Sequence, residues 1–412
     1  MHLEDAIRIG LKNNYDILMA RNREEAAQLN YKYAYGAFLP TLTGSASRTW
    51  STVHVNQKYS TGNDVERSNS KSNNTALSAD LDWTLFDGLR VFATRDKLKA
   101  IEELGTLQVK AQVVNSVAEI IGAYYDIILQ KQALKTIIEQ MGISRERVRI
   151  AHNKLLSGLG SKIDYMQARV DLNAQKADSL RQETEITKSK TVLNRLIQLP
   201  EDQQQYSVAD TIPVNMDLNY GSIQQTALSE NYELQAAQKD IEVSEWSLKE
   251  VNRSRFPVVS FTSSYSFSKQ NSQAGFFLFN QSNGLNYGFK ASIPLFQGFN
   301  INRQVKETKL DIAYQQMALE NSRSVVTAEI RNAYKDYAYF KDAIALEAEN
   351  MDVAEENAMV TLAAFRLGQV SSIEVKEAQQ SLSDARMRLI TDRYNAKLAE
   401  THLLQLKGAL LR

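Results

Sequence analysis

Four stretches of the chain alternate apolar and polar residues with a period of two, at 42–50, 77–85, 259–267 and 285–293. Such alternation predicts β-strands with two unlike faces, and each stretch has about the 9–11 residues that a tilted strand needs to cross a bilayer. A membrane barrel with an aqueous lumen would show this pattern, and so would a half-exposed soluble sheet, which the pattern alone favours. The apolar face of the second stretch carries Leu81, Trp83 and Leu85, and that of the fourth carries Leu285, Tyr287 and Phe289.

A second pattern, apolar residues at alternating steps of three and four, occupies two long stretches without proline. Proline disrupts helix interiors, so its absence leaves 89–156 free to form one helix of about 100 Å, at 1.5 Å per residue. The spacing is that of a coiled-coil seam, and a soluble antiparallel bundle would have the same seam. The first seam comprises Ala100, Leu104, Leu107, Ala111, Val114, Ala118, Ile121, Tyr125 and Ile128, and the second comprises Ala378, Leu382, Ala385, Leu389, Asp392, Ala396, Ala399, Leu403 and Leu406.

The composition argues against several classes of function. Lys+Arg and Asp+Glu are equal at 48 each, so the sequence has no electrostatic footprint for nucleic acid. Cysteine is absent, the four histidines are scattered, and neither an HExxH motif nor a phosphate-binding glycine loop occurs. We therefore expect no enzyme activity, no cofactor and no metal site. The first residues lack the basic and apolar parts of a signal peptide, and no run of about 18 apolar residues predicts a transmembrane helix.

The chain contains one unit twice. NYDI at 14–17 recurs as NYEL at 231–234, and LFDG recurs downstream as LFQG. The two copies differ in length only within the strand pair, where a Ser/Asn-rich loop over 51–74 corresponds to a shorter loop over 270–284. Each unit reads as a helix, two strands, a very long helix, a tight turn and a shorter helix. Four strands are too few to close a barrel and open edges cannot face lipid, whereas three chains would supply 12 strands.

The opening LEDAIRIGLKNNYDI, the strand exits LFDG and IPLFQG, and the turns SGLGSKIDYMQA and RLGQVSSIEVKEA resemble the outer-membrane efflux protein family of the TolC kind. The resemblance covers nearly all of the chain and appears in both halves. It implies an internally duplicated α+β membrane protein, whose two strand pairs per chain contribute to a trimeric 12-stranded β-barrel continued by a long α-helical coiled-coil tunnel across the periplasm.

The same resemblance implies a function and partners. The protein would be the exit duct of a tripartite efflux or type I secretion system in the outer membrane of a Gram-negative bacterium, and it would conduct substrates passively. Its partners would be two further copies of the chain, a periplasmic adaptor (membrane fusion) protein, an inner-membrane pump and outer-membrane lipid. The sequence does not indicate whether the cargo is a drug, a metal ion or a polypeptide.

Gly88, Pro294 and Gly298 fall at the two junctions between strand and long helix, where glycine allows the chain to turn. The linker between the repeats is expected to pack against the middle of the tunnel. The predicted segments are a periplasmic helix over 1–40, a β-hairpin over 41–86, a long helix with tip turn and return helix over 87–199, the linker over 200–221, and the corresponding parts of the second repeat over 222–257, 258–296 and 297–412.

Two turns between helices carry candidate functional residues. Gly158 and Gly368 follow a long helix at the position where a positive φ favours glycine, and Ser161 and Ser371 are placed to cap the helices that follow. The resemblance implies that these turns form the periplasmic tip and bind the adaptor. The candidate docking residues are Leu155, Gly158, Leu367 and Gly368, for which ordinary turn packing is an equal alternative.

The resemblance also places acidic residues just after the turns, in rings that close the pore: Asp164, Glu374 and Glu377. Three copies of each would repel one another in a narrow pore and attract cations. Asp164 and Glu374 have a structural interpretation as well, as helix N-terminal caps, so cap alone and cap plus gate are both open. The family pattern commonly has aspartate where Glu374 and Glu377 stand, and the longer side chains change the reach of any constriction.

A protein of another class would account for part of these patterns, namely a soluble coiled-coil scaffold with a small β module. Such a scaffold has no need of a lipid-facing surface. Lysine at Trp83 and at Phe289 should then be tolerated, whereas a membrane barrel should not tolerate it.

Overall fold

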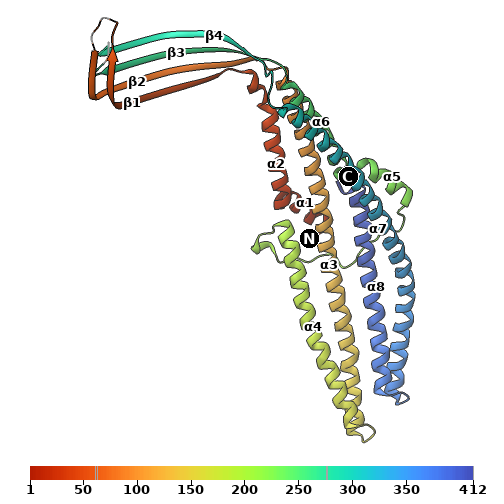
Figure 1. Ribbon diagram of the computed structural model, residues 1–412. Helices are drawn as coiled ribbons and strands as arrows, with labels where there is room; N and C mark the ends of the chain where they lie inside the picture. Colours follow the sequence, from red (N-terminus) through yellow and green to blue (C-terminus); the bar gives the residue numbers. More distant parts are fainter. Residues whose placement is uncertain (61, 63, 275–276, 412) are drawn as a thin grey trace. The chain divides into compact units, whose positions relative to one another are not determined.

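The computed structural model describes residues 1–412 apart from 61, 63, 275, 276 and 412, and it contains the same series of elements twice (Figure 1). The first series is α1 (Leu3–Asn13), α2 (Tyr15–Lys32), a 3₁₀ turn (Ala34–Phe38), β1 (Thr41–Lys58), β2 (Asp64–Phe86), α3 (Arg90–Leu156) and α4 (Lys162–Ile197). After a 3₁₀ turn (Glu201–Gln203), the second series is α5 (Tyr220–Glu230), α6 (Tyr232–Arg253), β3 (Val258–Ser272), β4 (Phe279–Ser292), α7 (Asn300–Leu367), α8 (Ser372–Leu406) and a last 3₁₀ turn (Ala409–Leu411). The duplication predicted from the sequence is confirmed, with 67 and 68 residues in the two long helices.

These elements form two compact units. The helical unit contains residues 1–24, 104–238 and 318–412, and the strand unit contains residues 25–103 and 239–317. The sheet belongs entirely to the strand unit, whereas α3 and α7 each run through both units.

The strand unit contains a four-stranded antiparallel sheet in the order β1-β2-β3-β4. Its register pairs Trp83 with Phe261, and Phe261 with Phe289. The next rung pairs Thr262 with Asp82, so polar side chains follow on the opposite face. Paired residues of adjacent strands share a face, and the alternation in the sequence therefore predicted the two faces of this sheet correctly.

The strands are longer than predicted, and the prediction of a loop over 51–74 is wrong. β1 and β2 continue as a paired hairpin through most of this segment, up to the rung between Lys58 and Asp64. The β3–β4 hairpin likewise extends into the predicted loop over 270–284. The added rungs are rich in Ser, Thr and Asn, so no apolar alternation marks them. Backbone hydrogen bonds form the ladder whatever the side chains are.

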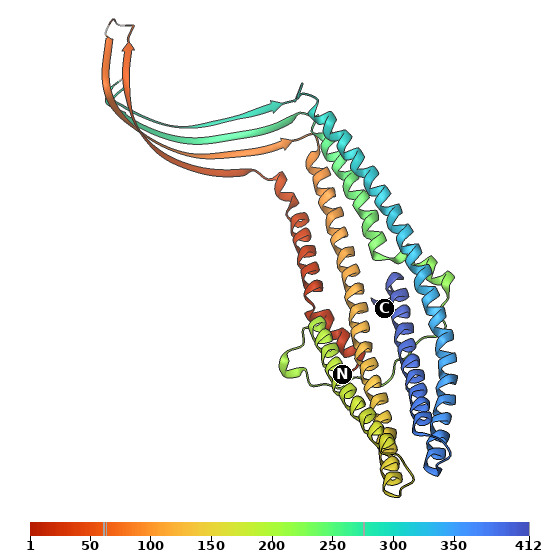
Figure 2. The same ribbon diagram turned by 60° about the horizontal axis from the view of Figure 1, so that its bottom comes forward.

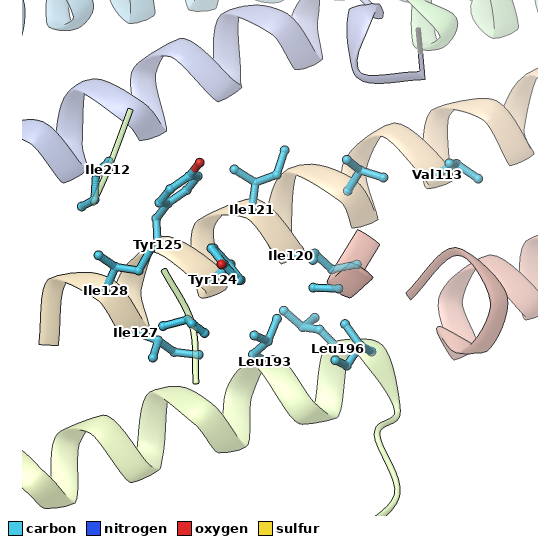
Figure 3. Close-up of a cluster of buried hydrophobic side chains, with 14 of the residues drawn as sticks. Val113, Ile120, Ile121, Tyr124, Tyr125, Ile127, Ile128, Leu193, Leu196 and Ile212 are labelled. Carbon is cyan, nitrogen blue, oxygen red and sulfur yellow. The ribbon is translucent and has the colours of Figure 1, made fainter. Parts of the chain in front are cut away.

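In the helical unit α3 buries two faces, as Figure 3 shows. One face carries the predicted seam, and there Lys397 of α8 lies over the ring of Tyr125 at 5.5 Å. The other face carries Ile120, which packs with Leu193 and Leu196 of α4. The second face was not predicted, because a search for one seam per helix does not anticipate a helix that lies between two neighbours.

The linker between the repeats packs against the helices of the helical unit. Val208 and Ile212 are buried in the same cluster as Tyr124. The hydroxyl of Tyr124 accepts a hydrogen bond from the N–H of Ala209 at 3.2 Å. The linker is not paired with a strand, so side chains of the long helices provide hydrogen-bond partners for some of its backbone N–H and C=O groups.

Each repeat begins with two helices, so the prediction of a single starting helix is wrong. The break falls at Asn14 in the first repeat and at Asn231 in the second, where each side-chain oxygen accepts from two N–H groups of the next helix at 2.9–3.2 Å. Each side-chain amide donates to a carbonyl at the end of a return helix, Leu196 for the first and Leu406 for the second, at 2.8 and 3.0 Å. The repeated asparagine thus joins the end of one helix to the start of another.

Candidate functional site

The turn between α3 and α4 and the turn between α7 and α8 end the two helical hairpins of the helical unit (Figure 1). Gly158 and Gly368 have φ values of +75° and +78°, in the left-handed region expected from the sequence. After each glycine, the next N–H bonds back across five residues into the long helix at 2.9 Å. Both long helices therefore end in the Schellman geometry that glycine favours.

The tip turns expose large apolar side chains. Leu159 and Leu367 are 83% and 75% exposed, whereas Leu155, a candidate docking residue, is half-buried. Leu156 and Ile163 are also exposed and were not selected from the sequence. The apolar surface of the first tip therefore extends about one helical turn on either side of Gly158.

The helices after the two turns are capped differently. Ser371 and Glu374 form a capping box, in which the Ser371 N–H donates to the Glu374 carboxylate at 2.6 Å and the Glu374 N–H donates to the Ser371 hydroxyl at 3.3 Å. At the first turn the Ser161 hydroxyl accepts from the N–H of Ile163 at 3.0 Å. Asp164 is exposed, and the bonds found among the described residues give it no part in this cap. The cap interpretation therefore applies to Glu374 and not to Asp164.

The carboxylate of Glu374 is held in its ionised form. The hydrogen bond from the Ser371 N–H keeps the pKa of Glu374 below its ordinary value. A carboxylate with a lowered pKa stabilises the fold above its unfolded pKa, and this stabilisation is lost as the pH falls through the folded pKa. The cap is thus insensitive to pH near neutrality. Glu377 lies three residues further along α8 and is exposed as well.

A buried polar cluster lies between the two hairpins, above the turns. Arg147 of α3 is only 1% exposed and forms an ion pair with Asp171 of α4, which also pairs with Lys376 of α8 at 3.0 Å. Gln379 of α8 accepts a hydrogen bond from Arg147 at 3.3 Å and donates to Ser144 of α3 at 3.4 Å. We call these five residues the cross-hairpin cluster, because they join α8 to both helices of the first hairpin.

The electrostatics of this cluster depend on all of its members. Burial opposes ionisation of Asp171, but hydrogen bonds from Lys376 and Gln167 and the charge of Arg147 outweigh it, so the pKa of Asp171 lies below its ordinary value. The Nε of Arg147 is buried without a hydrogen-bond partner among the described residues. Removing one member leaves a buried charge uncompensated. The cluster was not predicted, because a charged residue within a long helix normally indicates a solvent-exposed position.

The junctions between strand and long helix lie in the strand unit. Gly88 and Gly298 have φ values of +74° and +59°, and each is followed by a second residue with a positive φ. A Cβ at Gly88 would lie 2.5 Å from the Cβ of Phe256, so space as well as backbone conformation requires glycine there. Pro294 lies between the end of β4 and Gly298, and it belongs to neither β4 nor α7.

The residues predicted to face lipid are on the apolar face of the sheet. Phe289 is 76% exposed, and Tyr287 is exposed to a similar degree. The indole N–H of Trp83 donates to the carbonyl of Phe38 at 2.9 Å. Leu85 departs from the regular alternation, because it lies in a bulge at the end of β2. A contiguous surface of exposed aromatic side chains is typical of a face that contacts lipid or protein.

None of the described helices combines the length and the apolar composition needed to cross a membrane. In the same part of the chain, no group of three His, Cys, Asp or Glu side chains is placed to hold a metal ion.

Two long helical hairpins with exposed apolar and acidic side chains at their tips, combined with a sheet that has one apolar face, are the features expected of an outer-membrane channel subunit. The family model for outer membrane efflux proteins matches residues 6–197 and again residues 223–409, so the chain belongs to the outer membrane efflux protein family. The two matched segments correspond to the two repeats, which confirms the resemblance found in the sequence.

Individual relatives support this assignment over almost the whole chain. The chain is 26% identical over 417 residues to the cation efflux system protein CusC of Escherichia coli, covering 97% of this chain and 84% of CusC. It is 21% identical to the outer membrane efflux protein BepC of Brucella suis, covering 99% and 85%. The solved outer membrane channel CmeC of Campylobacter jejuni is similar with a TM-score of 0.81 at 16% identity, covering 99% and 85%. The predicted fold class, an α+β subunit of a trimeric barrel with a helical tunnel, is confirmed.

Proposed function

We propose that the protein is the exit duct of a tripartite efflux or type I secretion system, and that it conducts substrates passively from a periplasmic adaptor and an inner-membrane pump to the exterior. β1 and β4 are the edge strands of the sheet, and in lipid their outer backbone groups need partners from neighbouring chains. Energy comes from the pump. This chain supplies the wall, the opening and the charges around the opening.

The cross-hairpin cluster is the observation that carries this proposal. It holds the two hairpins of one chain together through a few polar bonds just above the turns. Bonds to water can replace such polar bonds, and the proposal therefore assigns the tip a second arrangement in which the two hairpins are separated. An adaptor bound at the exposed Leu159 and Leu367 would act directly on it. The names of the relatives, cation efflux for CusC and efflux for BepC, support export without defining one cargo.

Lysine on the apolar face of the sheet should prevent assembly in the membrane. We expect Trp83→Lys and Phe289→Lys to destabilise the inserted protein, by less than the about 2–4 kcal/mol of a midplane position, because their shared rung lies near one end of the strands. Asn286→Lys, on the polar face of β4, is the matched control and should assemble normally. The measurement is the fraction of folded trimer after refolding into lipid vesicles. Equal yields for all three variants would favour the soluble scaffold.

The gate and the cap at Glu374 can be separated by glutamine. Glu374→Gln with Glu377→Gln removes both charges, yet the glutamine carbonyl still accepts the Ser371 N–H, so the helix cap is kept. We expect the reconstituted channel to lose cation preference with only a small loss of thermal stability, since the cap bond is kept and only its charge is removed. Single-channel recordings with a salt gradient measure this preference, and an unchanged reversal potential would leave Glu374 as a cap alone.

A further inference from the structure

The apolar face of the sheet changes in chemistry along the strands. The rung of Trp83, Phe261 and Phe289 lies on this face, and alternate rungs beyond it belong to the same face. From the rung of Leu81 to the rung of Leu77, none of the residues on this face is charged, and all of them belong to the described part of the chain. These rungs form the apolar part of the surface.

Three exposed bases lie on the same face where the apolar rungs end. Arg48 and Lys269 are on the next rung, on either side of Thr75, and Lys71 lies four residues from Thr75 along β2. No acid shares this face between the levels of Lys71 and Trp83, and the described residues give the three bases no ion-pair partner. The face is therefore positively charged at this level.

Aromatic side chains mark both ends of this face. Trp83 lies at the end where β2 meets α3, and Trp50 lies on the rung of Asn73, toward the hairpin ends. Asn73 and Trp83 are ten residues apart on β2, which corresponds to about 34 Å along a strand and to a height of about 26 Å at a tilt of about 40°. Barrels of the outer membrane have an apolar band about 25 Å tall between two aromatic girdles. Trp50 therefore falls at the second boundary of the band, and Arg48 lies just inside it.

The position of the bases favours an anionic partner. A lysine or arginine side chain on a lipid-facing surface extends toward the headgroups, where its charge is solvated or paired. Arg48 and Lys269 are two strands apart on one rung, so their backbones are about 10 Å apart and both side chains can reach one anion above Thr75. Each already lies against an aromatic ring, Arg48 over Trp50 at 5.1 Å and Lys269 over Phe279 at 5.7 Å. A phosphate group suits this arrangement, because arginine binds it through two N–H donors and lysine binds it as a point charge.

A cavity of about 430 Å³ adjoins the bases on the hairpin side. Its lining includes Lys71, the amides of Asn73 and Asn271, and Trp50, which is 68% exposed. A cation over an aromatic ring covers one side of the ring, so the other side of the indole is open. Amide groups beside an open indole match a sugar, because its hydroxyls need donors and acceptors and its C–H faces pack on aromatic rings.

We propose that this surface binds the headgroup of a lipid whose sugar carries phosphate, in the leaflet at the hairpin ends of the sheet, where β1 and β2 continue beyond β3 and β4 (Figures 1 and 2). Arg48 and Lys269 hold a phosphate, Trp50 and the two asparagine amides contact the sugar, and the acyl chains lie along the apolar rungs. The inference rests on the proposed function, which places the sheet in the outer membrane. It gives the lipid-facing surface one preferred lipid in place of general contact with a bilayer.

Lipid binding to the detergent-solubilised trimer tests this site, and native mass spectrometry counts the bound lipids. The probes are lipid A, which is a diglucosamine lipid with two phosphates, the same lipid without its phosphates, and phosphatidylglycerol, which is anionic but has no sugar. We expect one lipid A per chain, bound at least about tenfold more tightly than either of the other lipids, since a charge-assisted bond contributes about that factor. Equal affinity for phosphatidylglycerol, or displacement of lipid A by excess inorganic phosphate, would overturn the assignment to a phosphorylated sugar lipid.

Substitutions separate the phosphate contacts from the sugar contacts. Arg48→Gln with Lys269→Gln should weaken lipid A by about tenfold or more and leave the lipid without phosphates unaffected. Trp50→Leu keeps an apolar side chain but removes the flat ring, so it should weaken both sugar lipids and leave phosphatidylglycerol unaffected. Lys290→Gln is the matched control, because Lys290 is an exposed base on the opposite face of the sheet, and it should bind lipid A like the wild type. Equal loss in the control and in the double variant would overturn the site.

The comparison of the three lipids uses the wild-type chain alone, so it remains decisive where a variant does not assemble. A wild-type trimer that inserts into vesicles but binds the three lipids alike would overturn this inference and leave the proposed function standing. A wild-type chain that neither forms a trimer in detergent nor inserts into vesicles would overturn the proposed function as well.

Discussion

Replacing Arg147 with alanine should open the periplasmic end of the channel and raise its basal conductance. The substitution removes the ion pair to Asp171 and the hydrogen bond to Gln379. Because Asp171 keeps its pair with Lys376, the cost should be below the about 3–5 kcal/mol of a buried charge left without any partner. The energy that holds the two hairpins together falls accordingly. Conductance of the reconstituted protein in planar bilayers measures the opening, and thermal unfolding in detergent measures the lost stability.

Arg149→Ala is the matched control, since Arg149 is an exposed arginine two residues away that pairs with Glu146 on the same helix. An exposed pair of this kind contributes about 0–1 kcal/mol, so neither conductance nor unfolding should change appreciably. If Arg147→Ala unfolds at a lower temperature but conducts like the wild type, the cross-hairpin cluster stabilises the fold without controlling the opening.

Replacing Asn231 even with aspartate should lower the free energy of unfolding. Alanine there removes a helix cap, at about 0.5–2 kcal/mol, and leaves the carbonyl of Leu406 unpaired, at about 1–3 kcal/mol more. Aspartate keeps the cap but turns a second oxygen toward that carbonyl in place of the amide donor. We therefore expect Asn231→Asp to be at least as destabilising as Asn231→Ala, although the two residues are equivalent at ordinary caps.

Unfolding in denaturant compares the two variants, and Asn219→Asp provides the control. Asn219 caps α5 through one bond from the N–H of Ser222 at 3.0 Å and is exposed. Aspartate should be accepted there. A wild-type midpoint for Asn231→Asp would show that only the cap matters at this position.

The elements of this fold were largely predictable because their signals are local and repeated. The α8 seam is buried at every predicted position except Asp392, the one polar residue in it, where burial raises the pKa of the carboxyl group. The two-faced strands and the glycine turns were found for the same reason. Each of these depends on periodicity or on a backbone conformation that few residues adopt.

Much of the candidate site was not predictable, because it depends on contacts across more than 200 residues of sequence. Arg147 and Gln379 are typical of exposed helix positions until the second hairpin is placed beside the first. Asn14 and Asn231 were recognised as matching residues of the two repeats. Their hydrogen bonds to the last turns of α4 and α8 could not be predicted from the spacing of residues in the sequence. The polar rungs beyond residue 51 were not predicted, because backbone hydrogen bonds form them and their side chains show no apolar alternation.

The near-equal lengths of α3 and α7 have a consequence for how such a channel changes over time. A trimer of duplicated chains has six hairpins around its mouth, and a substitution in one repeat alters only every second one. The two sets already differ in their helix caps, because Ser371 and Glu374 form a capping box after the second turn whereas Ser161 caps the helix after the first turn alone. Inheritance of both copies in a single gene thus permits division of labour around a ring without any loss of its symmetry.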